Sequence, residues 1–226
     1  CLRFADGAVQ GAIDRRHPER VVLAYQQAVL SLMRGREAGA MPDSLFVLGH
    51  GIGTIAERCG VRHVKVAEAD PAIADVSRRF FGANTDRVAI GDGRGILAGE
   101  PDGAYDCIVF DAFTARGTPP HLATAEAFAT AAAKLAPGGL LLLNAIGKPK
   151  GDRFVEAVHA TAREAFGWTK AYFVPGADDP GSGNVIVAAG RDAIGLRPRG
   201  PASLSEIPLG LGHVMRDRDR PPAAST

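Results

Sequence analysis

The sequence predicts an α/β fold built on a mostly parallel, doubly wound sheet. Short apolar runs alternate with amphipathic stretches along most of the 226 residues. A glycine-rich loop follows the first buried run, and acidic residues follow the next three. Strands that alternate with helices form parallel sheets, and such sheets bind ligands at the carboxyl ends of their strands. We therefore expect the glycines and the acids to meet at one edge of the sheet.

The N-terminal part precedes this alternation. Residues 2–4 and 8–10 flank Asp6-Gly7, a pattern typical of a small β-hairpin. Apolar residues then recur at helical spacing over 18–33, which predicts a helix with proline near its start. We assign residues 1–34 to this hairpin and helix, interpreted as the remnant of a small β domain.

Residues 35–190 carry the main alternation. The first predicted strand is followed by the glycine loop, and helices separate the later strands. Apolar runs predict strands over 44–48, 61–67, 88–90, 105–110 and 140–144, and helical spacing predicts helices over 52–59, 71–81, 123–135 and 152–166. We interpret this part as a Rossmann-like nucleotide-binding domain.

Two late strands, over 171–174 and 184–189, are joined by a loop rich in Gly, Pro and Asp. A connection of only about ten residues cannot hold the helix of a parallel crossover, so the pair is predicted to be antiparallel. An antiparallel pair that closes an otherwise parallel sheet is typical of the class I S-adenosylmethionine-dependent methyltransferase-type Rossmann fold. Beyond it, residues 191–226 are rich in Pro, Arg and Gly and predict a poorly ordered tail, apart from a possible short segment near 204–211.

Composition excludes several classes of function. The net charge is +1, which argues against nucleic acid as a partner, because phosphate binding usually needs a basic face. No apolar run reaches the roughly 20 residues that span a bilayer. The three cysteines are scattered, which favours the reducing cytoplasm over a disulfide framework. The histidines have no spacing typical of a metal site, and we expect none.

The loop after the first strand reads Gly49-His50-Gly51-Ile52-Gly53. Glycines let the backbone turn sharply and approach a ligand, and the amides that open the next helix can hold a polar group. We expect Gly49, His50, Gly51 and Gly53 to contact a nucleotide, although such a loop is also typical of a plain tight turn.

Three acids follow the next strands. Glu68 is placed to accept hydrogen bonds from ribose hydroxyls, with capping of the following helix as the alternative. Asp92, followed by Gly93, can accept from an adenine amino group or form an ordinary turn. Asp111 follows a buried strand, where it could orient or deprotonate an amine, bind the sulfonium side of a donor, or cap a helix. A nicotinamide-binding domain would share only the loop and the first acid. The combination therefore indicates a site for an adenosyl-sulfonium nucleotide or its thioether product.

In order and spacing, the chain resembles the spermidine synthase (polyamine aminopropyltransferase) family. The similar segments are residues 47–53, 66–71, 90–93, 105–111 and 135–139. Residues 2–10 look like the family's hairpin, which ends in a substrate-gate glutamine, here Gln10. Residues 22–26 resemble its Tyr-His-Glu segment, with Tyr25 as the tyrosine.

The resemblance implies a function. The donor would be decarboxylated S-adenosylmethionine, the product methylthioadenosine, and the acceptor a small-molecule amine. Glu68 would hold the ribose, Asp92 the adenine, and Asp111 would help to remove the proton from the attacking amine. Gln10 and Tyr25 would line the cleft. The resemblance also implies a homodimer.

The chain departs from the family pattern at several acids. Ile52 stands where the family has an Asp that grips the aminopropyl ammonium, and Thr114 replaces the second acid of the Asp-Ser-Ser/Thr-Asp-Pro motif. Gln26 and Gln27 replace the His and Glu of the Tyr-His-Glu segment. A diamine is a dication whose buried ammonium groups need carboxylate partners.

Asp178 and Asp179, in the late loop, could supply some of the lost charge, although Asp is also a common turn residue.

Three hypotheses therefore stand. The first is an aminopropyltransferase. The second is a methyltransferase or related alkyl transferase, which loss of the acid at Ile52 favours because it relieves repulsion with the carboxylate of intact S-adenosylmethionine. The third is a non-catalytic nucleotide-binding module.

Overall fold

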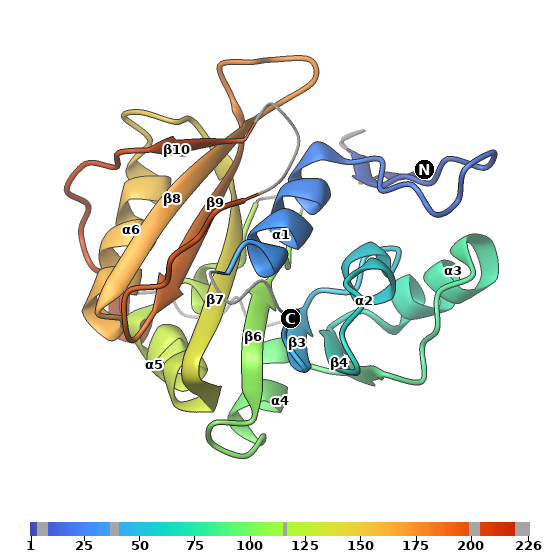
Figure 1. Cartoon of the computed structure of the whole chain (residues 1–226), viewed down its shortest axis with the longest axis horizontal. Helices are drawn as coiled ribbons and strands as arrows, with labels where there is room; N and C mark the ends of the chain where they lie inside the picture. Colours follow the sequence, from blue (N-terminus) through green and yellow to red (C-terminus); the bar gives the residue numbers. More distant parts are fainter. Residues whose placement is uncertain (4–8, 37–40, 115–116, 199–203, 220–226) are drawn as a thin grey trace.

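An eight-stranded sheet organises the chain, in a computed structural model that describes residues 1–3, 9–36, 41–114, 117–198 and 204–219 (Figure 1). The strand order is β10-β8-β9-β7-β6-β3-β4-β5. The strands are β3 (Ser44–Leu48), β4 (His63–Glu68), β5 (Val88–Ile90), β6 (Tyr105–Phe110), β7 (Leu135–Gly147), β8 (Trp168–Pro175), β9 (Gly183–Gly190) and β10 (Ser205–Ile207).

The sheet is parallel from β5 to β7, and its last strands reverse direction. β9 runs antiparallel to both β7 and β8, as the short connection between the two late strands predicts. A mostly parallel sheet closed by an antiparallel strand is the arrangement that the sequence predicts. The predicted fold class is therefore confirmed.

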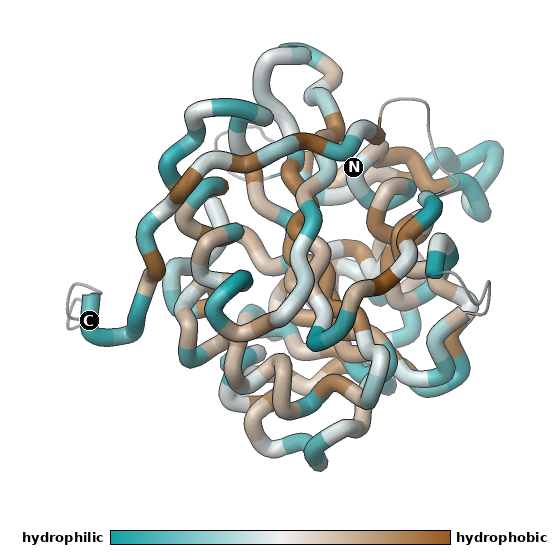
Figure 2. Tube along the Cα trace, turned by 60° about the vertical axis from the view of Figure 1, so that its left-hand side comes forward, coloured by the Kyte–Doolittle hydropathy of each residue, from teal (hydrophilic) through white to brown (hydrophobic). Residues whose placement is uncertain are grey.

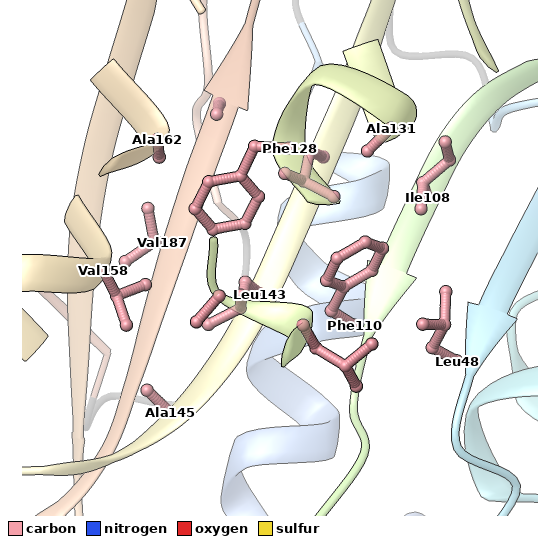
Figure 3. Close-up of a cluster of buried hydrophobic side chains, with 14 of the residues drawn as sticks. Leu48, Ile108, Phe110, Phe128, Ala131, Leu143, Ala145, Val158, Ala162 and Val187 are labelled. Carbon is pink, nitrogen blue, oxygen red and sulfur yellow. The ribbon is translucent and has the colours of Figure 1, made fainter. Parts of the chain in front are cut away.

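Helices cover both faces of the sheet. On one face, α4 (Gly93–Ala98), α5 (Ala125–Lys134) and α6 (Arg153–Ala165) bury one alternate set of strand side chains. Figure 3 shows Phe128 of α5 and Val158 of α6 against Phe110 and Leu143. On the other face, α1 (Ala24–Arg34) and α2 (Thr54–Arg58) pack on the opposite set, including Leu45. Because both faces are covered, apolar segments run through the interior and hydrophilic ones gather at the outer turns (Figure 2).

Local signals place α3 (Pro71–Phe81) where the sequence predicts it. The Asp70 side chain accepts a hydrogen bond from the Ala72 amide, Pro71 occupies the first turn, and Gly82 ends the helix in the left-handed region with φ of 69°. Asp70 is therefore the cap of this helix, which leaves Glu68 available for another role.

Two helix predictions need correction. The helix expected over 18–33 begins only at Ala24, because residues 18–20 form a turn and Val21 bridges Ile13. The Val21 carbonyl accepts a hydrogen bond from the Gln27 side chain at 2.7 Å. Helix α4 was not predicted, because it is short and glycine-rich. The other predicted elements are present: those over 44–48, 71–81, 88–90 and 105–110 have the predicted ends, and the rest have shifted ends.

The N-terminal hairpin pairs β1 (Leu2–Arg3) with β2 (Val9–Gly11) in antiparallel register. Its predicted turn at Asp6-Gly7 lies outside the described residues. A side chain at Gly11 would come within 2.7 Å of the Ile52 side chain, so β2 lies directly on the glycine loop. Helix α1 contributes to the core beside β3, and the proposed boundary at residue 34 stays a prediction.

The short segment expected near 204–211 contains a strand, and the order extends to 212–219, which were expected to belong to the poorly ordered tail. Within the segment singled out near 204–211, β10 pairs antiparallel with β8, with Ser205 opposite Phe173. The chain then reaches α5, where the Met215 carbonyl accepts a hydrogen bond from the Ala125 amide, and ends in the short helix η2 (Asp217–Asp219). This polar segment is ordered because it packs against residues that lie far from it in the sequence. Among the described residues, no helix is long and apolar enough to cross a membrane.

Candidate functional site

A pocket of about 930 Å³ opens at the carboxyl edge of the parallel strands. Its size falls in the usual range for small-molecule sites. Most of the residues predicted to form a site line it: Gln10, Tyr25, Gly49, His50, Gly51, Glu68, Asp92, Gly93 and Asp111. The lining extends from the end of β5 to the ends of β8 and β9, so the pocket crosses nearly the whole sheet.

Gly49 brings two strand ends together. It has a φ of 94°, and its amide donates to the Ala67 carbonyl at 2.8 Å. An added Cβ would collide with the Asp111 carbonyl oxygen. Only glycine allows β3 and β6 to end this close to each other, so the loop and Asp111 share one wall of the pocket.

Gly53 lies outside the lining of the main pocket. It lies with Ile52 at a smaller neighbouring pocket of about 200 Å³, and its left-handed turn (φ of 84°) starts α2. The backbone has turned away from the main pocket by this residue. The Ile52 side chain faces Gly11 of the hairpin, which places the departure from the family pattern at the contact between hairpin and loop.

His50 is 7% exposed and is anchored to α3. Its Nε2 lies 2.7 Å from Ser77 Oγ, whose own proton is donated to the Ala74 carbonyl. His50 Nε2 is therefore the donor in this pair. Burial lowers the pKa of His50, which favours the neutral ring, and Nδ1 has no hydrogen-bond partner among the residues described.

Glu68 is held by two backbone amides. Its Oε2 accepts from the His50 amide at 2.9 Å and its Oε1 accepts from the Asp70 amide at 2.9 Å. Each carboxylate oxygen has a second lone pair, so Glu68 can still accept hydrogen bonds from two ribose hydroxyls.

Asp92 caps α4 and faces the pocket. Its Oδ2 accepts from the Gly95 amide at 2.9 Å, and its Oδ1 lies 3.0 Å from His121 Nε2. Burial by itself raises the pKa of Asp92, but the hydrogen bonds from Gly95 and His121 outweigh burial and lower it. The turn role and the predicted ligand role are compatible, because capping occupies only one oxygen.

Asp111 is surrounded by side chains. Asn144 Nδ2 donates to its Oδ1 at 2.8 Å, and the Tyr25 hydroxyl donates to its Oδ2 at 3.3 Å. Burial raises the pKa of Asp111 to about 7, although both hydrogen bonds act in the opposite direction. Such a carboxylate can take up and release a proton near neutral pH.

Three residues of this site were missed from the sequence. Asn184 Nδ2 donates to Asn144 Oδ1 at 3.0 Å and so orients the amide that holds Asp111. The signal was available, because Asn144 ends one predicted strand and Asn184 begins another at the same edge of the sheet. His121 carried no such signal, since it lies in the short helix η1 (Pro120–Leu122) within a long connection.

The acids of the late loop do not supply the lost charge. Asp178 and Asp179 are exposed and lie outside the pocket lining, and Asp179 Oδ1 accepts from the Gly181 amide in a turn. The turn interpretation is therefore the correct one. Thr114, which replaces an acid of the family pattern, lines the pocket. In the described part of the chain, no group of three or more metal-ligating side chains comes together.

Comparisons with known proteins agree with this architecture, although no family model matches the chain. Spermidine synthase of Coffea arabica is 30% identical over 159 residues, which are 66% of this chain and 50% of that protein. Polyamine aminopropyltransferase of Vibrio vulnificus is 28% identical over 166 residues, 70% and 54% of the two chains. Putrescine N-methyltransferase 1 of Nicotiana tabacum is 27% identical over 172 residues, 71% and 44%. The chain spans about half the length of the curated relatives it matches.

Solved structures show the same fold. A probable spermidine synthase from Corynebacterium glutamicum superposes with a TM-score of 0.73 at 22% identity, covering 83% of this chain and 71% of that one. Human methyltransferase-like protein 13 superposes with a TM-score of 0.60 at 22% identity, covering 80% and 86%. The sheet order and the acid-lined pocket thus define a domain of the class I methyltransferase type. Within that class, the chain is a divergent relative of the spermidine synthases.

Proposed function

We propose that this chain transfers an aminopropyl group from decarboxylated S-adenosylmethionine to a small-molecule amine and releases methylthioadenosine. The observation that carries the proposal is the row of Glu68, Asp92 and Asp111 along one pocket, in which the last has a pKa of about 7. The sequence relatives support the same reaction class.

The donor would lie over β3, β4 and β5. Glu68 would accept from the ribose hydroxyls, Asp92 from the adenine amino group, and the backbone of Gly49 to Gly51 would allow close approach. Both Glu68 and Asp92 accept backbone hydrogen bonds at 2.9 Å, so their carboxylates are oriented before a ligand arrives. Preorganised acceptors reduce the cost of ordering on binding.

Transfer needs one proton acceptor. The amine nitrogen attacks the methylene carbon next to the sulfonium, the carbon–sulfur bond breaks, and the bonding pair returns to sulfur as a neutral thioether. The proton on the attacking nitrogen would pass to Asp111 when its carboxylate is ionised. The leaving thioether needs no acid, so positioning and one base are sufficient.

The acceptor end of the pocket favours an amine with a single buried charge. Asp111 is the one carboxylate among the described residues that line this end, beyond β6. Apolar side chains form much of the remaining wall, including Val22, Phe113, Ile146 and Val174. Ile146 is 53% exposed in the free chain, so an apolar substituent could cover it. A second buried ammonium would need a carboxylate of its own.

One experiment tests the reaction. Calorimetry compares binding of S-adenosylmethionine, its decarboxylated form and methylthioadenosine, and assays then supply putrescine or n-butylamine with each donor. Methylthioadenosine formed only from the decarboxylated donor supports the proposal, and faster reaction with n-butylamine supports the single-charge acceptor. No binding of any adenosyl compound would remove every enzyme hypothesis.

The second candidate is methyl transfer from intact S-adenosylmethionine. It is favoured by the similarity to putrescine N-methyltransferase 1 of Nicotiana tabacum, which is 27% identical over 172 residues. S-adenosylhomocysteine as the product in the same assay would establish this alternative and exclude the first.

We further propose that the chain works as a homodimer in the cytoplasm. The cysteines Cys1, Cys59 and Cys107 are free thiols, which suits a reducing compartment. The mass in solution, measured by light scattering, tests the dimer, and cell fractionation tests the location.

A further inference from the structure

The C-terminal segment reaches the back of the adenine end of the pocket. Both oxygens of Asp217 accept hydrogen bonds from Arg94, Nη1 to Oδ1 and Nη2 to Oδ2, each at 2.8 Å. This two-point pairing fixes the plane of the guanidinium. Thr124 Oγ1 donates to the same carboxylate at 2.9 Å. Asp217 is 123 residues away from Arg94 in the sequence, so only the folded chain brings them together.

Residues 215–219, here called the clasp, are also tied to two helices. The Asp217 amide donates to Glu126 of α5 at 3.0 Å, and the Met215 amide donates to Thr161 of α6 at 3.0 Å. A separate ion pair joins Arg216 to Glu164 of α6. The clasp is therefore fixed to α5 and α6, and its Asp217 holds the Arg94 guanidinium in place.

Arg94 connects the clasp to the pocket. It follows Gly93 in the first turn of α4, and its Nη1 also donates to the His121 carbonyl at 3.3 Å. The His121 ring in turn contacts Asp92, with Nε2 3.0 Å from Oδ1. Hydrogen bonds thus connect Asp217 to Arg94, Arg94 to the His121 backbone, and the His121 ring to Asp92.

His121 has a reason to need this support. It lies in the short helix η1, inside the connection that leaves β6, whereas Asp92 belongs to the edge of the sheet near β5. The side chains of both residues are partly exposed, 30% for His121 and 59% for Asp92. Both line the pocket. The hydrogen bond from Arg94 to the His121 carbonyl helps to hold the His121 ring at the adenine end of the pocket.

We propose that His121 is a nucleotide-binding residue and that Asp217 is a positioning residue that acts on it through Arg94. The proposal rests on the adenosyl site of the proposed function. With Gly95 on Oδ2 and His121 on Oδ1, the Asp92 carboxylate has one orientation, and its remaining lone pairs point to where a 6-amino group would lie. The pair therefore selects a 6-aminopurine and rejects a 6-oxopurine, whose carbonyl oxygen would face the carboxylate.

The test compares binding of methylthioadenosine and methylthioinosine by calorimetry in four variants. His121→Ala should weaken methylthioadenosine binding about tenfold and reduce the preference for it over methylthioinosine. His121→Gln should restore part of both, because its amide can still donate to Asp92. Asp217→Asn should act in the same direction by about threefold, because Arg94 loses a charged partner. Glu164→Gln is the matched control, because it removes the ion pair between Arg216 of the clasp and α6 without touching Arg94. It should change neither the affinity for methylthioadenosine nor the preference over methylthioinosine.

The outcomes separate the possibilities. Unchanged discrimination in both His121→Ala and Asp217→Asn would overturn the proposal, as would equal losses in Asp217→Asn and Glu164→Gln, which would indicate general loosening. Melting temperatures of all variants identify any that fail to fold. If the wild-type chain binds methylthioadenosine but transfers no group, the proposed transfer reaction is excluded. The roles of His121 and Asp217 are then still decided by the binding of the four variants. Wild-type chain that binds no adenosyl compound would overturn both.

Discussion

The two ends of the pocket hold their carboxylates in different ways. At the nucleotide end, backbone amides hold Glu68 and Asp92, the His121 side chain also contacts Asp92, and the pKa of Asp92 is lowered. At the acceptor end, side chains from distant elements hold Asp111, and burial raises its pKa to about 7. A carboxylate that stays charged suits binding, whereas one that titrates near neutral pH suits proton transfer. The comparison assigns binding to one end and chemistry to the other.

Asp111→Asn should have the largest effect, because it removes the base without changing the nucleotide end. We expect the rate of transfer at saturating donor to fall by roughly 10²–10⁴, the usual contribution of a positioned base. Methylthioadenosine affinity should stay near the wild-type value. Asp179→Asn, in an exposed turn outside the pocket lining, is the control and should keep full activity. A large loss of nucleotide affinity in Asp111→Asn would contradict the division between the two ends.

Asp92→Ala tests the other end. Loss of a charged hydrogen-bond acceptor should weaken methylthioadenosine binding by roughly 1.5–3 kcal/mol, or about 10- to 160-fold in Kd. The rate at saturating donor should change much less, since Asp111 is intact. Steady-state kinetics beside calorimetry would check this, and a fall in kcat with unchanged Kd would reverse the assignment.

The pH dependence of the wild-type chain should follow Asp111. Only the ionised carboxylate accepts a proton, so kcat/KM should rise with pH and level off above a pKa of about 7. Below that value the rate should fall about tenfold per pH unit, because the proportion of ionised carboxylate falls in that way. The pKa of Asp92 is lowered, so this carboxylate should add no second limb near neutral pH. A profile that stays flat from pH 5 to 8 would exclude Asp111 as the base.

Tyr25→Phe should have the smallest effect. The Tyr25 hydroxyl donates to Asp111 and helps to stabilise its charge, so its loss should raise the pKa of Asp111 further. The rate profile should therefore move to higher pH, with a fall of only a few-fold at pH 7 and no change in methylthioadenosine affinity. Tyr105→Phe is the matched control, since that hydroxyl donates to Glu100 instead of Asp111. Equal shifts in both variants would show that the Tyr25 contact has no specific role.

Local chemistry in the sequence determined much of the fold and part of the site. A capping Asp70, Pro71 in the first turn and Gly82 at the end were enough to place α3, because these signals act within a few residues. The acids at the strand ends could be grouped because parallel strands end at a common edge. Glu68, Asp92 and Asp111 therefore line one pocket as predicted.

The tertiary structure decided the partners of those acids. Asn144 contacts Asp111, His121 contacts Asp92, and Asn184 orients Asn144, all only after distant segments meet. Gly53 and Ile52 lie at a different pocket, where Gly53 is in the left-handed region. The clasp at Asp217 looked like part of a polar tail, since its order comes from α4, α5 and α6 and from no pattern of its own. The sequence by itself determined which groups stand at the sheet edge, because that depends on local spacing. Only the folded chain decided their charge and orientation, because burial and hydrogen-bond partners depend on residues far apart in sequence.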